Sequence, residues 1–377
     1  MIEKINAQKD LFILEEGVTY LNCSYMSPML KSVRDAGLHA LEMRASPWNL
    51  SSGDWFTNAE TLRSFAANIF KTSNDNIALI PSASYGLAIA GKNLNLKQGK
   101  EIIILEHQYP SNYYIWEHLA ETQKLQMVVV QKSETKTLTA NILEKINANT
   151  GIIAIPNCHW IDGAYIDLQQ ISDAAKQTGS YFVLDLSQSL GVLPIDIEKI
   201  DPDFAVSVGY KWMLGPYSLG YLYVSKRWQQ LGEPLEYSWA TRYGSENFTD
   251  LTNYVKEYRD GARKFDMGEF SQINLLPMAI AALQQINNWQ MNSVQSQIKK
   301  LTDKIITYKK SNDLPQNDEG VGHIINIPVK ELNINTLREN LKENKVVVSF
   351  RGSSIRVSPH LYNTEEDIEK LFSCLDI

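Results

Sequence analysis

The sequence has few cysteines, and their positions exclude two classes of site. Cys23, Cys158 and Cys374 are the three in 377 residues, and no pair has Cys-x-x-Cys spacing. A disulfide framework needs paired cysteines, and a structural zinc site needs clustered ones. We therefore expect no metal centre and no disulfide-stabilised secreted domain, but a protein of a reducing compartment.

The sequence also lacks long apolar runs and basic clusters. No run approaches the roughly 18 apolar residues of a membrane span, and MIEKINAQKDLF lacks the basic and apolar order of a signal peptide. The net charge is −7, with no basic cluster longer than a pair, so no nucleic-acid footprint is present. We expect a cytoplasmic protein whose partner is a small molecule, and neither nucleic acid nor membrane.

Short apolar runs alternate with helical stretches from residue 76 to residue 225. They are NIALIPS, EIIILEH, QMVVVQK, GIIAIPN, YFVLDLS, DFAVSVG and LGYLYVS. This alternation is typical of an α/β fold with a mainly parallel, seven-stranded sheet.

The pattern changes after residue 255. A long helix around Ile280–Ile305, the run HIINIPV, a helix over Asn333–Glu343 and the runs VVVSF and SIRVS indicate a smaller α+β domain. We predict an N-terminal segment (1–25) that packs with the small domain, a large α/β domain (26–255) and the small domain (256–377).

Asp185 and Lys211 are the most informative pair. Asp185 ends the run YFVLD, and Lys211 follows DFAVSVGY, which suits ligand binding at the carboxyl ends of strands. A lysine amine can hold an aldehyde cofactor as a Schiff base, and a carboxylate can keep a pyridine nitrogen protonated. Taken alone, Lys211 is typical of a surface lysine after a strand, and Asp185 of a turn residue. However, Lys211 is flanked by Tyr210, Trp212 and Met213, and a buried unpaired ammonium is costly. The pair predicts a pyridoxal 5′-phosphate (PLP) site.

Two other strings that follow strands would suit a phosphorylated aromatic aldehyde. In PSASYGLAIAG, the N–H groups of Ala83 and Ser84, with the Ser84 hydroxyl, would hold a phosphate at a helix N-terminus, although serine caps are common in any helix. Tyr109 in EHQYPSNYYIW could lie on the pyridine ring or belong to the core. His107 is the competing residue on the ring, or a solvated loop residue.

Further strings supply candidates for substrate contact. His159 and Trp160 in IPNCHWIDGAYIDL could reach the cofactor or the substrate, and His159 could equally be a structural histidine. Arg356 in FRGSSIRVSPHLYNT has the fork geometry that suits a substrate carboxylate. Arg351 could assist it or be an exposed loop arginine, and Asn22 is a further candidate for substrate binding.

These strings together resemble the class V aminotransferase family of fold-type I PLP enzymes, which includes cysteine desulfurases, selenocysteine lyases, kynureninases and isopenicillin-N-epimerase-like proteins. The resemblance covers nearly the whole chain and is carried by SASYG, DLSQSLG, GYKWMLGP and SIRVSPHLYNT. It implies that Lys211 forms the internal aldimine with PLP, Asp185 pairs with the pyridine nitrogen and Gln188 approaches the phenolic oxygen. It also implies that Arg356 takes the substrate carboxylate.

Some strings are similar to kynureninase in particular. CHWIDG resembles its histidine-aromatic segment, QYPSNYY its stacking segment, and Tyr210 its phosphate-binding tyrosine beside the lysine. On this basis Tyr109, and not His107, is placed on the ring. The family forms homodimers whose sites take residues from both subunits, so we expect a homodimer in which Trp239 or Ser271 reaches the neighbouring phosphate.

The resemblance implies an enzyme that acts on a small α-amino acid through an external aldimine and a quinonoid, with an aminotransferase as the first prediction. A Cβ–S lyase, a kynureninase-like Cβ–Cγ hydrolase and an epimerase are alternatives, and a PLP or amino-acid binding module is the non-enzymatic one. Desulfurases carry a cysteine shortly before the arginine, whereas RGSSIR has serines, so persulfide transfer is not expected. Kynureninase proper has an N-terminal motif that YLNCSYMSP does not match.

Overall fold

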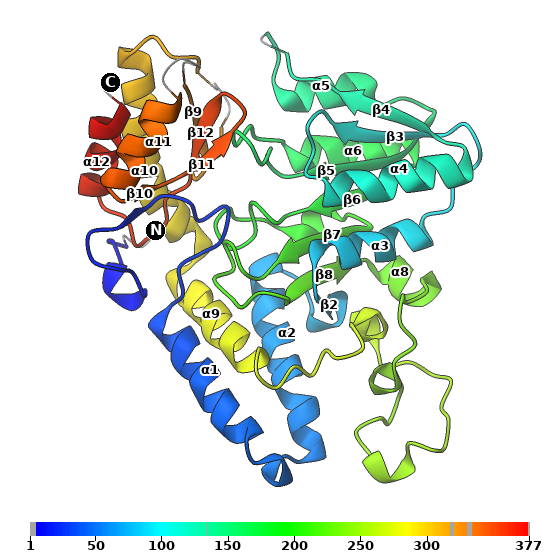
Figure 1. Cartoon of the computed structure of the whole chain (residues 1–377). Helices are drawn as coiled ribbons and strands as arrows, with labels where there is room; N and C mark the ends of the chain where they lie inside the picture. The colour runs from blue at the N-terminus through cyan, green and yellow to red at the C-terminus, as the bar shows by residue number, and fades with distance from the viewer. Residues whose placement is uncertain (1–4, 134, 317–319, 330–333, 376–377) are drawn as a thin grey trace.

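The computed structural model describes residues 5–133, 135–316, 320–329 and 334–375. Its largest feature is a seven-stranded sheet in the order β2-β8-β7-β6-β5-β3-β4 (Figure 1). β8 runs antiparallel to its neighbours β7 and β2, and the other neighbouring strands pair in parallel. The strands are β2 (Ile77–Ile80), β3 (Glu101–Leu105), β4 (Gln126–Val130), β5 (Thr150–Pro156), β6 (Tyr181–Asp185), β7 (Phe204–Val208) and β8 (Gly220–Val224). They are the seven predicted runs, so the predicted α/β fold is confirmed.

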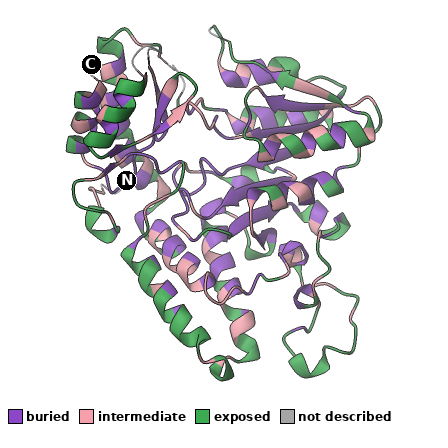
Figure 2. Cartoon of the chain, in the orientation of Figure 1, coloured by how far each residue is buried: buried purple, intermediate pink, exposed green. Residues whose placement is uncertain are grey.

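Helices cover both faces of the sheet, which explains why its strands are continuous apolar runs. Along β3, Ile102 and Ile104 enter one apolar core, while Ile103 and Leu105 enter the other. Figure 2 shows the strands as the buried centre of this part. The first core includes residues of α3 (Ala83–Asn93), α4 (Ser111–Gln123) and α8 (Lys226–Leu231). The second includes residues of α2 (Thr57–Phe70), α5 (Leu138–Lys145), α6 (Leu168–Thr178) and α7 (Ile197–Ile200).

α3 packs closely on the sheet because residue 86 is glycine. A Cβ at Gly86 would lie 2.6 Å from Val206 Cγ1 and 2.8 Å from Ile80 Cδ1. A larger residue would therefore push the helix away from β7. Since α3 begins at Ala83, directly after β2, this packing holds its N-terminus at the carboxyl edge of the sheet.

The C-terminal part has its own apolar core and small sheets. β11 (Ser349–Arg351), β12 (Ser354–Val357) and β9 (Ile325–Pro328) form an antiparallel sheet in that order. The N-terminal segment joins this part, because β1 (Thr19–Tyr20) pairs in parallel with β10 (Val346–Val347). Figure 1 shows both chain ends on this side. The helices of this core are α10 (Met291–Ser311), α11 (Ile334–Glu343) and α12 (Glu365–Leu375).

After residue 255 the structure has two helices where the sequence predicted one. The single helix expected around Ile280–Ile305 is wrong, because α9 (Leu276–Trp289) and α10 are separated at Gln290, which has a left-handed φ of +61°. α9 packs against α1 (Lys31–Arg44) and α2, beside the large sheet. α11 agrees with the helix predicted there, although Asn333 lies outside the described residues. The division of the chain at residue 255 stays a prediction.

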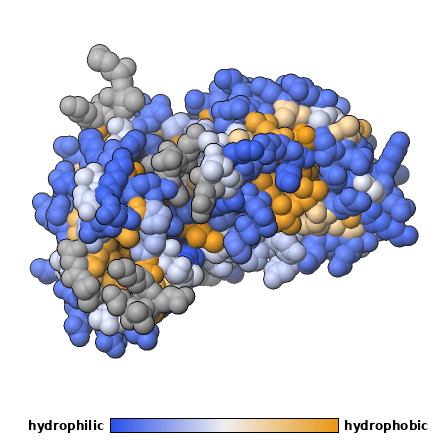
Figure 3. All heavy atoms as spheres, turned by 90° about the horizontal axis from the view of Figure 1, so that it is seen from above, coloured by the Kyte–Doolittle hydropathy of each residue, from blue (hydrophilic) through white to orange (hydrophobic). Residues whose placement is uncertain are grey.

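The surface carries no sign of a membrane-spanning helix. Within the described ranges, no helix is both long enough and apolar enough to cross a bilayer. The face seen in Figure 3 is mainly hydrophilic, with apolar patches among the polar residues. The cytoplasmic location stays a prediction.

Candidate active site

Four of the predicted site residues lie at the carboxyl edge of the large sheet. Tyr109 follows β3, Trp160 follows β5, Asp185 ends β6 and Lys211 follows β7. Parallel strands end at the same edge, so these side chains meet although they are far apart in sequence. They line two adjoining cavities that share several residues, and the larger cavity has a volume of about 520 Å³.

Lys211 is held in an aromatic environment with little access to water. Its side chain is 7% exposed, and its Nζ lies 5.3 Å from the centre of the Tyr109 ring and 5.8 Å from that of Tyr210. Among the described residues it forms no ion pair. Burial lowers the pKa of the Lys211 amine to about 8, although the charge of Asp185 raises it. A buried amine with a lowered pKa is a competent nucleophile.

Asp185 presents a buried carboxylate to the smaller cavity. Its Oδ1 accepts a hydrogen bond of 2.9 Å from the Ser187 N–H. The Ser187 hydroxyl is buried, lines the same cavity and has no hydrogen-bond partner in the part of the chain that the structure describes. This side of the cavity therefore offers an acid and a free hydroxyl.

Gln188 faces both cavities with part of its hydrogen-bonding capacity already used. Its Nε2 donates to Ser24 O over 3.1 Å, and its Oε1 accepts from Trp212 Nε1 over 3.0 Å. A side-chain amide has two N–H groups, so one remains for a ligand. This placement is compatible with the predicted approach to a phenolic oxygen.

Tyr109, and not His107, faces the cavities. Tyr109 lines both of them and makes an edge contact with Trp160, with ring centres 5.6 Å apart. The His107 side chain is 75% exposed and lines neither cavity. The backbone carbonyl of His107 accepts a 2.7 Å hydrogen bond from Nε1 of the cavity residue Trp160. The contact of Tyr109 with a cofactor ring stays a prediction.

His159 lines the smaller cavity, but both of its ring nitrogens contact protein groups. Nε2 lies 3.2 Å from Glu106 O, while Nδ1 lies 3.2 Å from Lys132 Nζ and 3.3 Å from Asp162 Oδ1. These contacts favour the structural alternative that the sequence left open. The predicted catalytic role of His159 stays a prediction and has no geometric support from these contacts.

Arg351 and Arg356, which we call the cavity arginines, reach the larger cavity from the hairpin of β11 and β12. Arg356 is 1% exposed, and its Nη1 donates to Trp160 O over 2.8 Å. Arg351 is half-buried, and its Nη1 donates to Phe350 O over 2.8 Å. Both Nε atoms are buried without a partner among the described residues. Burial, together with the nearby charge of Arg351, lowers the pKa of Arg356 to about 9.

Three predicted residues, Ala83, Ser84 and Asn22, line neither cavity. Ala83 and Ser84 form the first turn of α3, where backbone N–H groups have no partner within the helix. Their contact with a phosphate stays a prediction. Asn22 Oδ1 accepts a 2.7 Å hydrogen bond from Ser349 Oγ, and Ser349 pairs with Arg356 across the hairpin. Asn22 therefore supports the strand of Arg356, and its direct contact with substrate stays a prediction.

Trp239 and Ser271 lie away from both cavities. Trp239 is 42% exposed and belongs to an aromatic cluster with Trp55, Phe56 and Phe248, whereas Ser271 is buried. The homodimer, and the reach of either residue to a neighbouring subunit, stay predictions.

Some cavity residues were missed by sequence reasoning. Ser24, Tyr25 and Met26 line the larger cavity beside Tyr217 and Tyr210. Within the string YLNCSYMSP only Asn22 was a candidate, and nothing in the composition of the string places Ser24, Tyr25 or Met26 near Lys211. This segment contacts the residue beside Lys211, because the Ser27 N–H donates a hydrogen bond to Tyr210 O over 3.0 Å.

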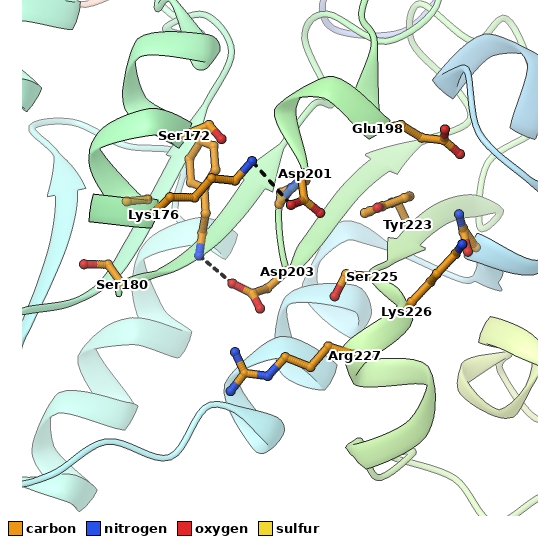
Figure 4. Close-up of a pocket in the computed structure, with 14 residues that line it drawn as sticks. Ser172, Lys176, Ser180, Glu198, Asp201, Asp203, Tyr223, Ser225, Lys226 and Arg227 are labelled. Atoms are coloured by element: carbon orange, nitrogen blue, oxygen red, sulfur yellow. Dashed lines mark hydrogen bonds and ion pairs between the residues drawn. The ribbon is translucent and has the colours of Figure 1, made fainter. Parts of the chain in front are cut away.

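A second hollow, of about 470 Å³, lies at the opposite edge of the sheet, where β6 and β7 begin (Figure 4). Several of its charged groups are engaged with protein partners. Lys176 Nζ lies 3.3 Å from Asp201 Oδ2, and Asp203 Oδ2 accepts a 2.9 Å hydrogen bond from the Phe182 N–H. Since ligands of such sheets bind at the carboxyl edge, we do not assign the catalytic site there.

The groups at the carboxyl edge fit PLP. A phosphorylated pyridine aldehyde needs an amine, an acid for its ring nitrogen and a flat neighbour, which Lys211, Asp185 and Tyr109 provide. The unpaired Lys211 amine and the unpartnered Ser187 hydroxyl are buried polar groups that a bound molecule would satisfy.

Comparisons with known proteins find relatives along most of the chain. The chain is 25% identical over 312 residues to the uncharacterized aminotransferase YcbU of Bacillus subtilis (strain 168), covering 82% of this chain and 80% of that protein. The apo structure of cysteine desulfurase from Thermococcus onnurineus NA1 superposes with a TM-score of 0.85 at 18% identity, covering 98% of this chain and 97% of the other. The cystine C–S lyase C-DES, solved with its product cysteine persulfide, gives 0.84 at 18% identity, covering 96% and 98%. At these identities the two structures establish the fold.

The family follows from a match along most of the chain. The sequence model of the family described as aminotransferase class-V matches residues 48–371, which span the cavity residues from Tyr109 to Arg356. The chain therefore belongs to the class V aminotransferase family, and the prediction of a PLP-dependent enzyme is confirmed.

Proposed function

We propose that this enzyme is an aminotransferase that acts on an α-amino acid. The observation that carries the proposal is that Lys211 is the one amine lining the cavities within the described ranges, while both His159 nitrogens are engaged elsewhere. Lys211 would therefore be the single base available to move a proton at the substrate Cα, which suits amino-group transfer.

Each remaining residue has a separate task in this proposal. When bound, PLP supplies an aldehyde that takes up the substrate amine and a protonated ring that withdraws electrons from Cα. Asp185 holds the proton on the ring nitrogen, and Arg356 binds the α-carboxylate and so orients the Cα–H bond toward Lys211. Tyr109 and Tyr210 keep water from the Lys211 amine.

A Cβ–S lyase is the second candidate, favoured by the structural likeness to C-DES, a cystine C–S lyase. Transfer of a persulfide through a protein thiol is disfavoured, because Cys23, Cys158 and Cys374 are all buried. Burial also raises the pKa of the Cys158 thiol well above its usual value, which suppresses the reactive thiolate. A lyase that needs no protein cysteine remains the alternative to test.

A half-reaction separates the two candidates. The purified holoenzyme is mixed with single amino acids in the absence of a keto-acid acceptor. An aminotransferase should release one equivalent of keto acid per site, after which release should stop. The amino group of the amino acid then stays with the cofactor because no acceptor is present. Continuous release of pyruvate with sulfide, or of alanine from kynurenine, would reject transamination in favour of a lyase or a hydrolase.

The capture of PLP by cofactor-free protein should depend on pH with a midpoint near 8. The neutral amine attacks an aldehyde, and burial lowers the pKa of Lys211 from 10.5 to about 8. The rate should therefore rise through pH 8, where it is half-maximal, and level off above about pH 9, as followed by absorbance. Asp185→Asn should move the midpoint lower, because the carboxylate favours the charged amine. A midpoint near 10.5 would contradict the burial argument.

Arg356→Lys should raise the KM for the amino acid and leave cofactor affinity unchanged. Lysine keeps the charge but cannot form two parallel hydrogen bonds to a carboxylate. Losing a hydrogen bond to a charged group costs about 1.5–3 kcal/mol, or roughly ten- to a hundred-fold in kcat/KM. Steady-state kinetics and the cofactor absorption band measure the two effects. Normal kinetics with lower thermal stability would mean that Arg356 has a structural role only.

A further inference from the structure

The cavity arginines differ from three other buried or half-buried arginines of the described residues in their lack of acid partners. Arg63, Arg259 and Arg263 each form an ion pair with a carboxylate, at 2.8, 3.2 and 2.7 Å respectively. Neither cavity arginine forms an ion pair with any carboxylate in the described ranges, and each bonds only to a backbone carbonyl there. A buried guanidinium without a counter-charge is costly, so an anion from outside the chain is expected at this position.

The two cavity arginines present their charges side by side. Arg356 pairs with Ser349 across the hairpin, and Arg351 is two residues further along the same strand as Ser349. This diagonal relation puts both side chains on one face of the hairpin. Both guanidinium groups also lie over the Trp160 ring, at 5.3 Å for Arg351 and 6.0 Å for Arg356. The Trp160 ring therefore serves as a shared platform for two cations.

The cavities have more positively charged side chains than carboxylates. Lys211 and the two cavity arginines carry the positive charges, while Asp185 is the single Asp or Glu among the described lining residues. Asp185 is assigned to the cofactor's ring nitrogen, so it is not available to the arginines. An α-carboxylate neutralises one guanidinium and leaves the other without a partner.

The depths of the two arginines assign their roles. Arg356 is almost fully buried, beside the reacting groups, whereas Arg351 is half-buried and lies nearer the cavity mouth. Tyr25 and Tyr217, which are 59% and 63% exposed, also line this cavity and add hydroxyl groups. A group bound by Arg351 is therefore at the distal end of a substrate whose α-carboxylate is on Arg356.

We propose that the substrate carries a second anionic group, such as a distal carboxylate, sulfinate or phosphate, which Arg351 binds while Arg356 binds the α-carboxylate. This substrate class rests on the proposed function, because it assumes that the cavity takes an amino acid.

Binding of amine-free dicarboxylates to the holoenzyme tests this proposal without turnover. Calorimetry should show that glutarate or succinate binds at least about ten-fold more tightly than butyrate, since a second charge-assisted contact adds affinity. Arg351→Gln should remove this preference and change butyrate affinity less than about two-fold. Arg351→Lys should keep part of the preference, because the charge remains.

Arg338→Gln provides a matched control. Arg338 also lies over an aromatic ring, 3.8 Å from the centre of Phe350, but it is exposed and lines neither cavity. This variant should keep the dicarboxylate preference. Equal affinity of the wild type for glutarate and butyrate would overturn the proposal. So would an Arg351→Gln variant that weakens both ligands equally, because both arginines would then hold one carboxylate. Neither ligand depends on transamination, so a failed half-reaction leaves this result interpretable.

Discussion

Lys211→Ala should yield a folded protein that cannot link PLP covalently and loses amino-group transfer by at least about 10⁴-fold. The large effect is expected because the same amine holds the aldehyde and moves the Cα proton. Folding should be retained, since Lys211 forms no ion pair among the described residues and its burial is unfavourable for the charged amine. Borohydride reduction of the wild-type holoenzyme, followed by peptide mapping, should place the label on Lys211.

Lys264→Ala is a suitable control for this result. Lys264 is also 7% exposed, and burial lowers its pKa, but it lines neither cavity. Its replacement should leave the borohydride label in place. A label on any lysine other than Lys211 in the wild-type protein would reject the assignment.

Asp185→Asn should lower kcat by roughly 10²-fold or more with only a modest loss of bound PLP. An amide cannot hold the proton on the ring nitrogen, so electrons leaving Cα are stabilised less well. The local fold should persist, because the asparagine Oδ1 can still accept the hydrogen bond from the Ser187 N–H. Single-turnover kinetics and cofactor content measure the two effects separately.

Asp203→Asn is the matched variant for Asp185→Asn. Asp203 is a half-buried acid whose pKa burial raises, but it lies at the opposite edge of the sheet and accepts hydrogen bonds from Phe182 and Trp228. Its replacement should lower thermal stability and leave kcat nearly unchanged. Near-normal turnover of Asp185→Asn would show that Asp185 is not the partner of the ring nitrogen.

Sequence patterns predicted the sheet well because most of its strands, the edge strand β4 excepted, are buried on both faces. Such strands are continuous apolar runs, and each of the seven runs became one strand. The helix around Ile280–Ile305 was wrong because the apolar pattern continues across the break at Gln290, whose left-handed backbone leaves no trace in that pattern. The packing of α9 against α1 and α2 is likewise a long-range contact that no local pattern specifies.

The sequence by itself determined the fold class, the family and the pairing of a strand-end acid with a lysine. These features depend on local apolar runs and short motifs, which can be recognised without the tertiary structure. The choice of Tyr109 over His107 on the cofactor ring was also made from the sequence and stays a prediction. In the structure Tyr109 lines both cavities and His107 lines neither.

Only the tertiary structure decided how the remaining groups meet. It brings Ser24, Tyr25 and Met26 to the larger cavity from a segment far from Lys211 in sequence. It also engages both nitrogens of His159 with Glu106, Lys132 and Asp162, contacts that span up to 53 residues. Only the tertiary structure shows that Arg351 and Arg356 have no acid partner among the described residues. That absence depends on the elements packed around the cavity and not on the string that contains the arginines.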